Sequence, residues 1–346
     1  MIKTGNLRFH LSSAVLALVC GFLFQGFTQA TLRSFEFNGH AQGTTYHILY
    51  YAPDSVVVRE QFDSIFNMID SSLSIYNFNS LISRFNNSDS GVRTDKHLRT
   101  VVEKSLAIFE DSGGLFDITV YPVVRAWGFG REPISARPDS GKIKALMNCV
   151  GSAKIYLKQD FLGKRVPCVE IDVNGIAQGY TVDVIADFLE RNNIENYLVE
   201  VGGELRVKGH KQPGQEPMRI GIESPATHKN DQPEIKKIIT LLQGAVTTSG
   251  TYRKQHKVGN KVVSHLMNPK TGYPIDNEML SATVIAKDAI TADGYDNVLM
   301  NLGVKDALLF MQRHGDMEAY LIYHKPDGSI GEIATPGFYK LVQEDP

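Results

Sequence analysis

Residues 286–303, AKDAITADGYDNVLMNLG, carry oxygen-bearing side chains where a plain amphipathic helix needs none. Asp293, Asp296 and Asn297 fall within about one and a half turns of an expected helix. Because positions i and i+4 share a helix face, the Asp293 carboxylate and the side-chain carbonyl of Asn297 can together hold a hard cation such as Mg²⁺. The alternative is helix capping, in which Thr291 or Asp293 is the N-cap and the helix dipole favours the acids.

A second candidate is the stretch EIDVNGIAQGYTVDVIADFLER, residues 170–191. We expect a strand to end at Asp172, Asn174 and Gly175 to form a tight turn, and a helix to run from residue 176 to residue 191. Glycine at such a junction lets the backbone approach a phosphate and present its amides and carbonyls. Any strand-to-helix connection can contain such a turn, so this signal is weak by itself.

Other polar side chains stand out against their surroundings. Residues 247–253, TTSGTYR, are dense in hydroxyls where a core strand would carry none. His265 follows a predicted strand; near hydroxyls and a cation it is a candidate proton acceptor, and otherwise a half-exposed hydrogen-bonding residue. Tyr76 and Arg84 either contact a ligand or belong to a surface loop. Asp117 is a lone acid among apolar neighbours, so it either caps the next turn or accepts a hydrogen bond from a ligand.

The elements that must position these residues follow from periodicity and turn signals. The hairpin-linked strands, interrupted by several helices, favour an α+β fold over a doubly wound sheet. Strands are expected over residues 35–51 (a pair broken at Gly43), 153–157, 165–173, 196–201, 204–209, 218–223, 238–242, 245–248, 319–323 and 338–342. Helices are expected over residues 56–73, 98–110, 143–149, 176–191 and 305–314, besides the one that ends at Gly303.

Composition excludes several classes of protein. With 42% hydrophobic and 21% charged residues, the chain has the composition of an ordinary globular protein. Its 346 residues can form one large domain or two ordinary ones. The net charge is −2 and no run of Lys and Arg stands out, which argues against a nucleic-acid partner.

The N-terminal residues 1–30 differ from the rest. Lys3 and Arg8 precede an almost charge-free apolar run over residues 11–27, and small residues lead to Ala30. This pattern predicts an export signal cleaved near Ala30; an uncleaved membrane anchor and lipidation at Cys20 are the alternatives. Cys149 and Cys168 remain, either as a disulfide or as two buried thiols.

Taken together, these stretches resemble the ApbE family, the periplasmic FAD:protein FMN transferases. The match runs in family order from about residue 41 to residue 303, through AQGTTYHI, LSIYNFNSLISRFN, SGGLFDITVYPVVRAWGFG, EIDVNGIAQGYTVD, VEVGGELRVKG, AVTTSGTYR, SHLMNPKTGYP and TADGYDNVLMNLG. The resemblance implies one flavin transferase domain over residues 31–346, with mixed, largely antiparallel sheets and packed helices.

The resemblance also implies an activity and a set of site residues. Family members bind FAD and Mg²⁺, cleave the pyrophosphate and join FMN to a Ser or Thr hydroxyl of an acceptor flavoprotein, such as a subunit of a redox-driven ion pump, with release of AMP. By position, the metal would be held by the Gly175 carbonyl, Asp293 and Asn297, with Mg²⁺ against Mn²⁺ left open, and His265 would take the proton from the acceptor hydroxyl. FAD would contact Gln42, Tyr76, Leu115, Phe116, Asp117, Asp172, Gln178 and Met267. The family's location implies an exported, periplasmic protein, with anchoring to the inner membrane by its N-terminal segment as the alternative.

Three positions depart from the family pattern. Asn297 replaces a usual Thr, Gln178 a usual Lys and Gln42 a frequent Met, which puts the rate or the flavin affinity in doubt. Two other functions share the same site: hydrolysis of FAD to FMN and AMP, and flavin binding without catalysis. The His265 and Asp293 side chains weigh against the second of these.

Overall fold

The computed structural model describes Met1 and residues 31–130, 134, 136–225, 234–252, 255–258 and 261–343. The predicted signal segment therefore lies, apart from Met1, outside the described residues. Within the described part of the chain, no helix has the length and apolar character needed to cross a membrane.

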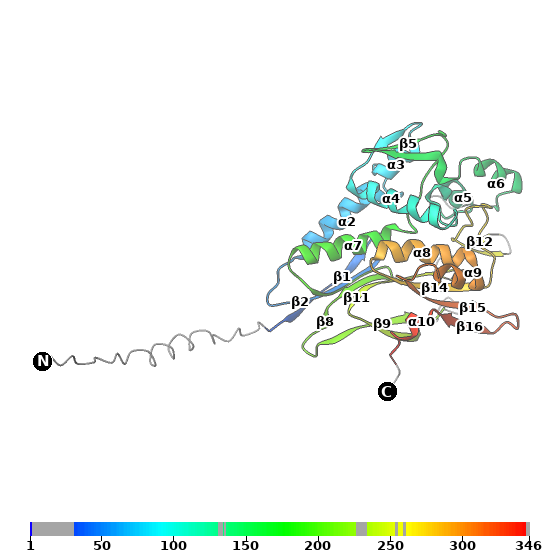
Figure 1. The fold of residues 1–346 in the computed structure, drawn as a ribbon. Helices are drawn as coiled ribbons and strands as arrows, with labels where there is room; N and C mark the ends of the chain where they lie inside the picture. Colours follow the sequence, from blue (N-terminus) through cyan, green and yellow to red (C-terminus); the bar gives the residue numbers. More distant parts are fainter. Residues whose placement is uncertain are drawn as a thin grey trace.

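An antiparallel sheet forms the centre of the molecule, and among the described residues it has eight strands (Figure 1). The spatial order is β1-β2-β6-β7-β11-β14-β15-β16, with every neighbouring pair antiparallel. The strands are β1 (Arg33–Ala41), β2 (Thr44–Ala52), β6 (Asn196–Val201), β7 (Glu204–Lys208), β11 (Gln243–Gly250), β14 (Met279–Ala286), β15 (Glu318–His324) and β16 (Ile330–Ala334).

Both faces of this sheet are covered, and each cover has its own apolar core. Helices α2 (Arg59–Leu73), α7 (Ala177–Arg191) and α8 (Ala289–Leu302) lie along one face, with α9 (Val304–Met311) beside α8 (Figure 1). The small sheet β8 (His210–Lys211), β9 (Glu216–Glu223) and β10 (Ile235–Leu241) covers the other face with α10 (Pro336–Tyr339). Successive side chains of a strand point to opposite faces. Val284 and Ile285 accordingly belong to different cores, which explains the continuous apolar run of β14.

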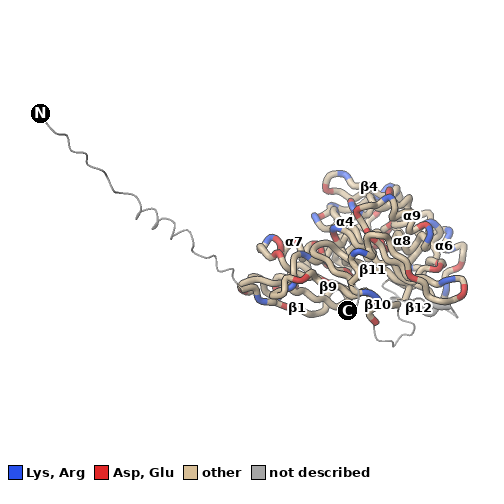
Figure 2. Tube along the Cα trace, turned by 60° about the horizontal axis from the view of Figure 1, so that its bottom comes forward, with Lys and Arg blue, Asp and Glu red and all other residues tan. Residues whose placement is uncertain are grey.

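A further layer lies outside the helices, at the top of Figure 1. Its helices are α3 (Leu81–Asn87), α4 (Lys96–Asp111), α5 (Tyr121–Ala126) and α6 (Ser140–Met147), with short 3₁₀ turns η1 (Ile118–Val120) and η2 (Ser152–Lys154). Its strands are β3 (Gly91–Arg93), β4 (Ile155–Lys158) and β5 (Phe161–Lys164), and the hairpin of β12 (Gln255–Val258) and β13 (Lys261–Ser264) stands apart. Basic and acidic residues are interspersed along the chain (Figure 2).

The α+β prediction is confirmed, but some predicted elements are wrong. Residues 165–173 form no strand, because Pro167 has no N–H and the amides of Ile171 and Asp172 bond to the Asn86 side chain and the Ile118 carbonyl instead. The strand that pairs with β4 is β5. Residues 338–342 are not a strand either: Phe338 belongs to α10, and the edge strand is β16.

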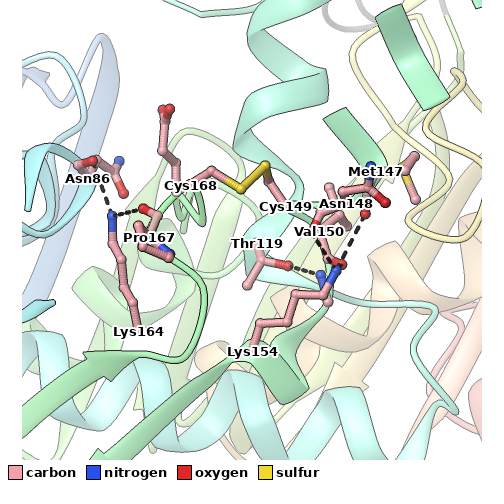
Figure 3. Close-up of a disulfide and its surroundings, with 12 residues drawn as sticks. Asn86, Thr119, Met147, Asn148, Cys149, Val150, Lys154, Lys164, Pro167 and Cys168 are labelled. Carbon is pink, nitrogen blue, oxygen red and sulfur yellow. Dashed lines mark hydrogen bonds between the residues drawn. A yellow bond between two sulfur atoms is a disulfide. The ribbon is translucent and has the colours of Figure 1, made fainter. Parts of the chain in front are cut away.

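Cys149 and Cys168 form a disulfide, which settles the alternative left open by the sequence (Figure 3). Cys149 follows α6, and its loop is also held by Lys154, whose ammonium donates to the carbonyls of Asn148 and Val150 at 2.8 and 2.6 Å. Cys168 lies between β5 and Asp172. The disulfide thus ties the loop after α6 to the segment that leads to the Asn174-Gly175 turn.

Removing this disulfide should lower stability without unfolding the sheet. Cys149→Ser with Cys168→Ser frees a segment with a sequence separation of 19 residues, and chain-entropy arguments for a loop of this size give a loss of about 3 kcal/mol in the free energy of unfolding. Chemical denaturation of the full chain measures this loss. A reductant should bring the wild-type protein to the variant's stability and leave the variant unchanged; equal stability of the two proteins without reductant would contradict the prediction.

Candidate functional site

A cavity of about 290 Å³ opens between the helix layer, the ends of strands β2, β7 and β11 of the central sheet, and the outer layer. All the site residues implied by the family resemblance line it, although they come from distant parts of the chain. They are Gln42, Tyr76, Leu115, Phe116, Asp117, Asp172, Gly175, Gln178, His265, Met267, Asp293 and Asn297. Arg84, in contrast, is not among the described residues that line this cavity.

The wall formed by α7 and α8 depends on a glycine. The backbone amide of Gly179 donates to Asp293 Oδ2 at 2.8 Å. A side-chain carbon at position 179 would lie 2.3 Å from the Ala289 carbonyl oxygen and 2.7 Å from Asp293 Cβ. The two helices therefore meet backbone to backbone, and this contact fixes the buried Asp293 carboxylate.

Two carboxylates fix the beginning of α8. Asp288 is the N-cap and accepts from the Thr291 amide at 3.1 Å, so neither predicted cap, Thr291 or Asp293, has that role. Asp183 of α7 accepts from the amides of Ala289 and Ile290 at 2.9 and 2.8 Å. These bonds satisfy amides that an α-helix leaves without intrahelical partners.

Asp183 is itself held by a cation. Arg206 of β7 approaches Asp183 Oδ1 at 3.0 Å and also contacts Asp187 and Glu190. Burial raises the pKa of Asp183 to about 6, although the two amides and the Arg206 charge act in the opposite direction. Asp183 thus positions α8 without lining the cavity.

Oxygen atoms converge around the side chain of Asn297. Its Nδ2 lies 3.2 Å from the Gly175 carbonyl oxygen, 2.9 Å from the Asp293 carbonyl oxygen and 3.0 Å from Asp296 Oδ1. Asp293 and Asp296 are both buried and line the cavity. The described residues contain no group of three His, Cys, Asp or Glu side chains suited to a metal. Two carboxylates, an amide and a backbone carbonyl nevertheless make an all-oxygen donor set that fits Mg²⁺ or Mn²⁺.

Asp117 has the capping role that the sequence left as one of two alternatives. It is 5% exposed, and its Oδ1 accepts from the Thr119 amide at 2.8 Å and from the Ser152 hydroxyl at 2.7 Å. Ser152 also donates its amide to Oδ2 at 3.0 Å. Asp117 therefore joins the cavity wall at η1 to the loop that contains Cys149.

The wall at Asp172 is connected to the same 3₁₀ turn. The Asp172 amide donates to the Ile118 carbonyl at 2.7 Å, and Asp172 Oδ1 accepts from the Asn174 amide at 2.8 Å. The second bond makes an Asx turn, which holds the chain in shape as it enters Gly175 and α7.

Two glutamines occupy backbone-defined positions at the edge of the cavity. Gln42 and Gly43 both have positive φ, 53° and 76°, as a two-residue type I′ hairpin requires between β1 and β2. Gln178 lies in the first turn of α7, and its Nε2 is close to Gly202, the first residue of the β6–β7 turn. The β1–β2 turn and the first turn of α7 therefore bring the side chains of Gln42 and Gln178 to one side of the cavity.

Tyr76 and His265 line the cavity from two further segments. The Tyr76 side chain is 57% exposed, and burial of its other part together with the Asp172 charge raises the pKa of its phenol. Tyr76 therefore stays neutral near pH 7 and offers a flat apolar ring. His265 is half-buried just after β13, with its ring centroid 6.2 Å from that of Phe129.

Several cavity residues were not among the site residues that the sequence analysis assigned to the metal, the flavin or the proton transfer. Glu204 is buried at the start of β7, and the Gly-Gly-Glu run in the quoted motif was its available signal. Asn174, Asn301, Thr248 and Ser249 also line the cavity. Asn301 follows Asn297 by one helical turn and donates its Nδ2 to the Asn297 carbonyl at 3.2 Å. Neighbouring turns of α8 thus present Asp293, Asn297 and Asn301 to the same cavity.

The fold and this site together indicate an α+β enzyme. Its oxygen donors, the N-terminus of α7 and His265 border one cavity. The ApbE family model matches residues 42–321. The chain belongs to the ApbE family.

Named relatives and solved structures agree with this assignment. The FAD:protein FMN transferase of Vibrio cholerae serotype O1 is 34% identical over 311 residues, covering 87% of this chain and 90% of the relative. That of Haemophilus influenzae is 31% identical over 328 residues, covering 91% and 93%. The structure of the flavin transferase ApbE from Vibrio cholerae superposes with a TM-score of 0.80 at 31% identity, covering 90% of this chain and 99% of that chain. The apo flavinyl transferase ApbE of Pseudomonas stutzeri gives 0.79 at 31% identity, covering 90% and 97%.

Gly179→Ala should separate α7 from α8, because the added carbon meets backbone rather than a flexible side chain. We expect a loss of about 1–3 kcal/mol in the free energy of unfolding, measured by chemical denaturation. Gly315→Ala is the matched control, since nothing lies within 4 Å of the added carbon there. Equal effects of the two substitutions would show that the close helix contact is unimportant.

Asp183 should make stability depend on pH. Its pKa in the folded protein, about 6, lies above the ordinary 3.8, so the folded state binds the proton more tightly. The contribution to stability is therefore greatest below pH 4 and is lost as the pH rises through 6; the shift corresponds to roughly 3 kcal/mol. Urea denaturation at several pH values should show this decline in the wild-type protein relative to Asp183→Asn. Asp187→Asn, at an exposed contact of the same arginine, should retain the wild-type pH dependence.

Proposed function

We propose that this chain is an FAD:protein FMN transferase that uses Mg²⁺ and an acceptor Ser or Thr hydroxyl and releases AMP. Family membership and the names of its relatives support flavin transfer. The single structural observation in favour of the finer proposal is that the oxygen donors around Asn297, the N-terminal end of α7 and His265 all border one cavity.

The reaction is a phosphoryl transfer with a simple balance of bonds. The P–O bond between the FMN phosphorus and the bridging oxygen of FAD breaks, and a new P–O bond forms to the acceptor oxygen. The hydroxyl proton passes to the His265 side chain, and AMP leaves with the bridging oxygen. A positioned histidine is suited to this proton transfer because its ordinary pKa is close to the working pH.

The chain's own groups would bind and orient the flavin nucleotide. The Tyr76 ring would stack on the isoalloxazine or the adenine, as flat aromatic surfaces favour. The Gly175 turn and the first amides of α7 would lie against the phosphates, where a helix N-terminus favours negative charge. Gln178 would donate hydrogen bonds there without the positive charge of the family's usual Lys, which predicts weaker electrostatic stabilisation of the pyrophosphate.

The cation would be held by the Gly175 carbonyl, Asp293 and Asn297, whose oxygen chemistry fits it. When bound, Mg²⁺ neutralises charge that develops on the phosphate oxygens. Asp293 is already fixed by the Gly179 amide, so its carboxylate would not have to be ordered on binding.

We also propose that the protein is exported, with residues 1–30 as its signal or membrane anchor. The Cys149–Cys168 disulfide supports an oxidising compartment. The acceptor would then be an exported flavoprotein domain, such as that of a redox-driven ion pump subunit, with a reachable Ser or Thr hydroxyl.

The test is transfer to a defined acceptor. The full chain is incubated with FAD, Mg²⁺ and a small flavoprotein domain that bears the acceptor hydroxyl, and the acceptor is weighed by mass spectrometry. We expect a gain of one FMN. The rate should fall about 10²–10⁴-fold in His265→Ala, which removes the proton acceptor, and Asp293→Ala should abolish transfer. His324→Ala, at an exposed histidine at the end of β15, should react like the wild-type protein.

Other products would identify the alternatives. Free FMN and AMP without a change in acceptor mass would indicate an FAD hydrolase at the same site. Tight FAD binding with neither product would indicate a flavin carrier, and an unchanged rate in His265→Ala would contradict the proposed proton transfer.

A further inference from the structure

The side-chain amide of Asn297 occupies a position surrounded by hydrogen-bond acceptors. Its NH₂ group faces the carbonyl oxygens of Gly175 and Asp293 and the carboxylate of Asp296, at 3.2, 2.9 and 3.0 Å. The other end of the amide, Oδ1, faces the Ser249 hydroxyl, which donates to it at 3.5 Å. The donor end of the amide is therefore the end directed at the proposed cation site.

Elementary hydrogen-bond chemistry allows only this orientation before a cation binds. An amide oxygen placed among two carbonyl oxygens and a carboxylate would meet acceptors alone, and buried acceptors without donors are costly. The NH₂ group instead donates to this cluster and offsets part of its negative charge. In effect, the two amide hydrogens supply what a cation would supply.

A bound cation reverses this preference. The ion needs oxygen ligands, and the partial positive charge of an NH₂ group would be repelled. We propose that the side-chain amide of Asn297 takes the place of the cation in the metal-free protein. When the cation binds, the amide flips, so that its carbonyl oxygen replaces its NH₂ group at the site. This inference rests on the Mg²⁺ site of the proposed function.

The opposite side of the amide permits both orientations. A serine hydroxyl is both a donor and an acceptor. Ser249 can therefore donate to Oδ1 in the first state and accept from Nδ2 in the second, by rotation of its own hydrogen. The amide flip thus keeps the hydrogen bond between Ser249 and Asn297 and needs no backbone movement.

The stand-in has a structural consequence. Through the Gly175 carbonyl, the amide connects α8 to the turn before α7, so this contact holds the site together before the ion arrives. The entering ion must displace an existing hydrogen-bonded group. Asn297→Thr replaces the amide by one hydroxyl, which can coordinate a cation but supplies only one hydrogen to the cluster.

NMR of the full chain with selective ¹⁵N labelling of asparagine side chains tests the amide flip directly. Spectra are recorded in EDTA and then with Mg²⁺, and the Asn297 pair is assigned by its loss in Asn297→Thr. We expect Mg²⁺ to cause the largest shift of any asparagine amide at Asn297. The signals of the Asn301 side-chain amide should shift little, because this amide donates to the backbone carbonyl of Asn297, which does not take part in the flip.

Thermal unfolding gives a second measurement. Metal-free Asn297→Thr should unfold several degrees below the wild-type protein, and Mg²⁺ should raise its melting temperature more than that of the wild type. Asn301→Ala is the control, with the same loss in EDTA and in Mg²⁺. A merely structural role for Asn297 would likewise lower both forms equally.

The outcomes separate this inference from the proposed function. If calorimetry shows Mg²⁺ binding but the NMR signals of the Asn297 side-chain amide do not shift, the amide flip is wrong and the transferase proposal stands. If the wild-type protein does not bind Mg²⁺, both the amide flip and the metal-dependent part of the proposed function are wrong.

Discussion

The close approach of α7 and α8 is the constraint on which the rest of the site depends. It needs a residue without a side chain at position 179, where any added carbon would meet the Ala289 carbonyl. Gly294 of α8 packs closely on another side, since a carbon there would lie 2.3 Å from Ile108 Cδ1, a side-chain atom of α4. The helix that carries Asp293 and Asn297 is thus positioned by its close backbone contact with α7.

Buried carboxylates are stabilised in this structure by backbone amides. Asp293 accepts from Gly179, Asp183 from the first amides of α8, and Asp117 from the amides of Thr119 and Ser152. Amides are fixed dipoles that need no reorganisation, so they can hold negative charge in a poorly solvated place. The Asn297 side-chain amide likewise donates to the Gly175 carbonyl and the Asp296 carboxylate.

The outer layer connects the two remaining cavity walls. Asp117 holds the loop of Cys149, and the Asp172 amide bonds to the Ile118 carbonyl, while the disulfide joins the two segments a second time. The region therefore maintains the shape of the cavity, whereas α7 and α8 position the groups that carry charge.

The sequence by itself determined the elements that carry the donor cluster and the polar positions on them. The periodicity of α7, the turn at Gly175 and the i, i+4 spacing of Asp293 and Asn297 are local, and local rules of helix and turn geometry predicted them. Only the tertiary structure decided the partners. Asp183 caps a helix that begins 106 residues later, and Cys149 pairs with Cys168 although free thiols were equally compatible with the sequence. Residues 338–342 have a strand-like composition, yet Phe338 packs in a helix against the sheet. In each case the outcome depends on which distant surface lies opposite, and periodicity along the chain contains no information about that surface.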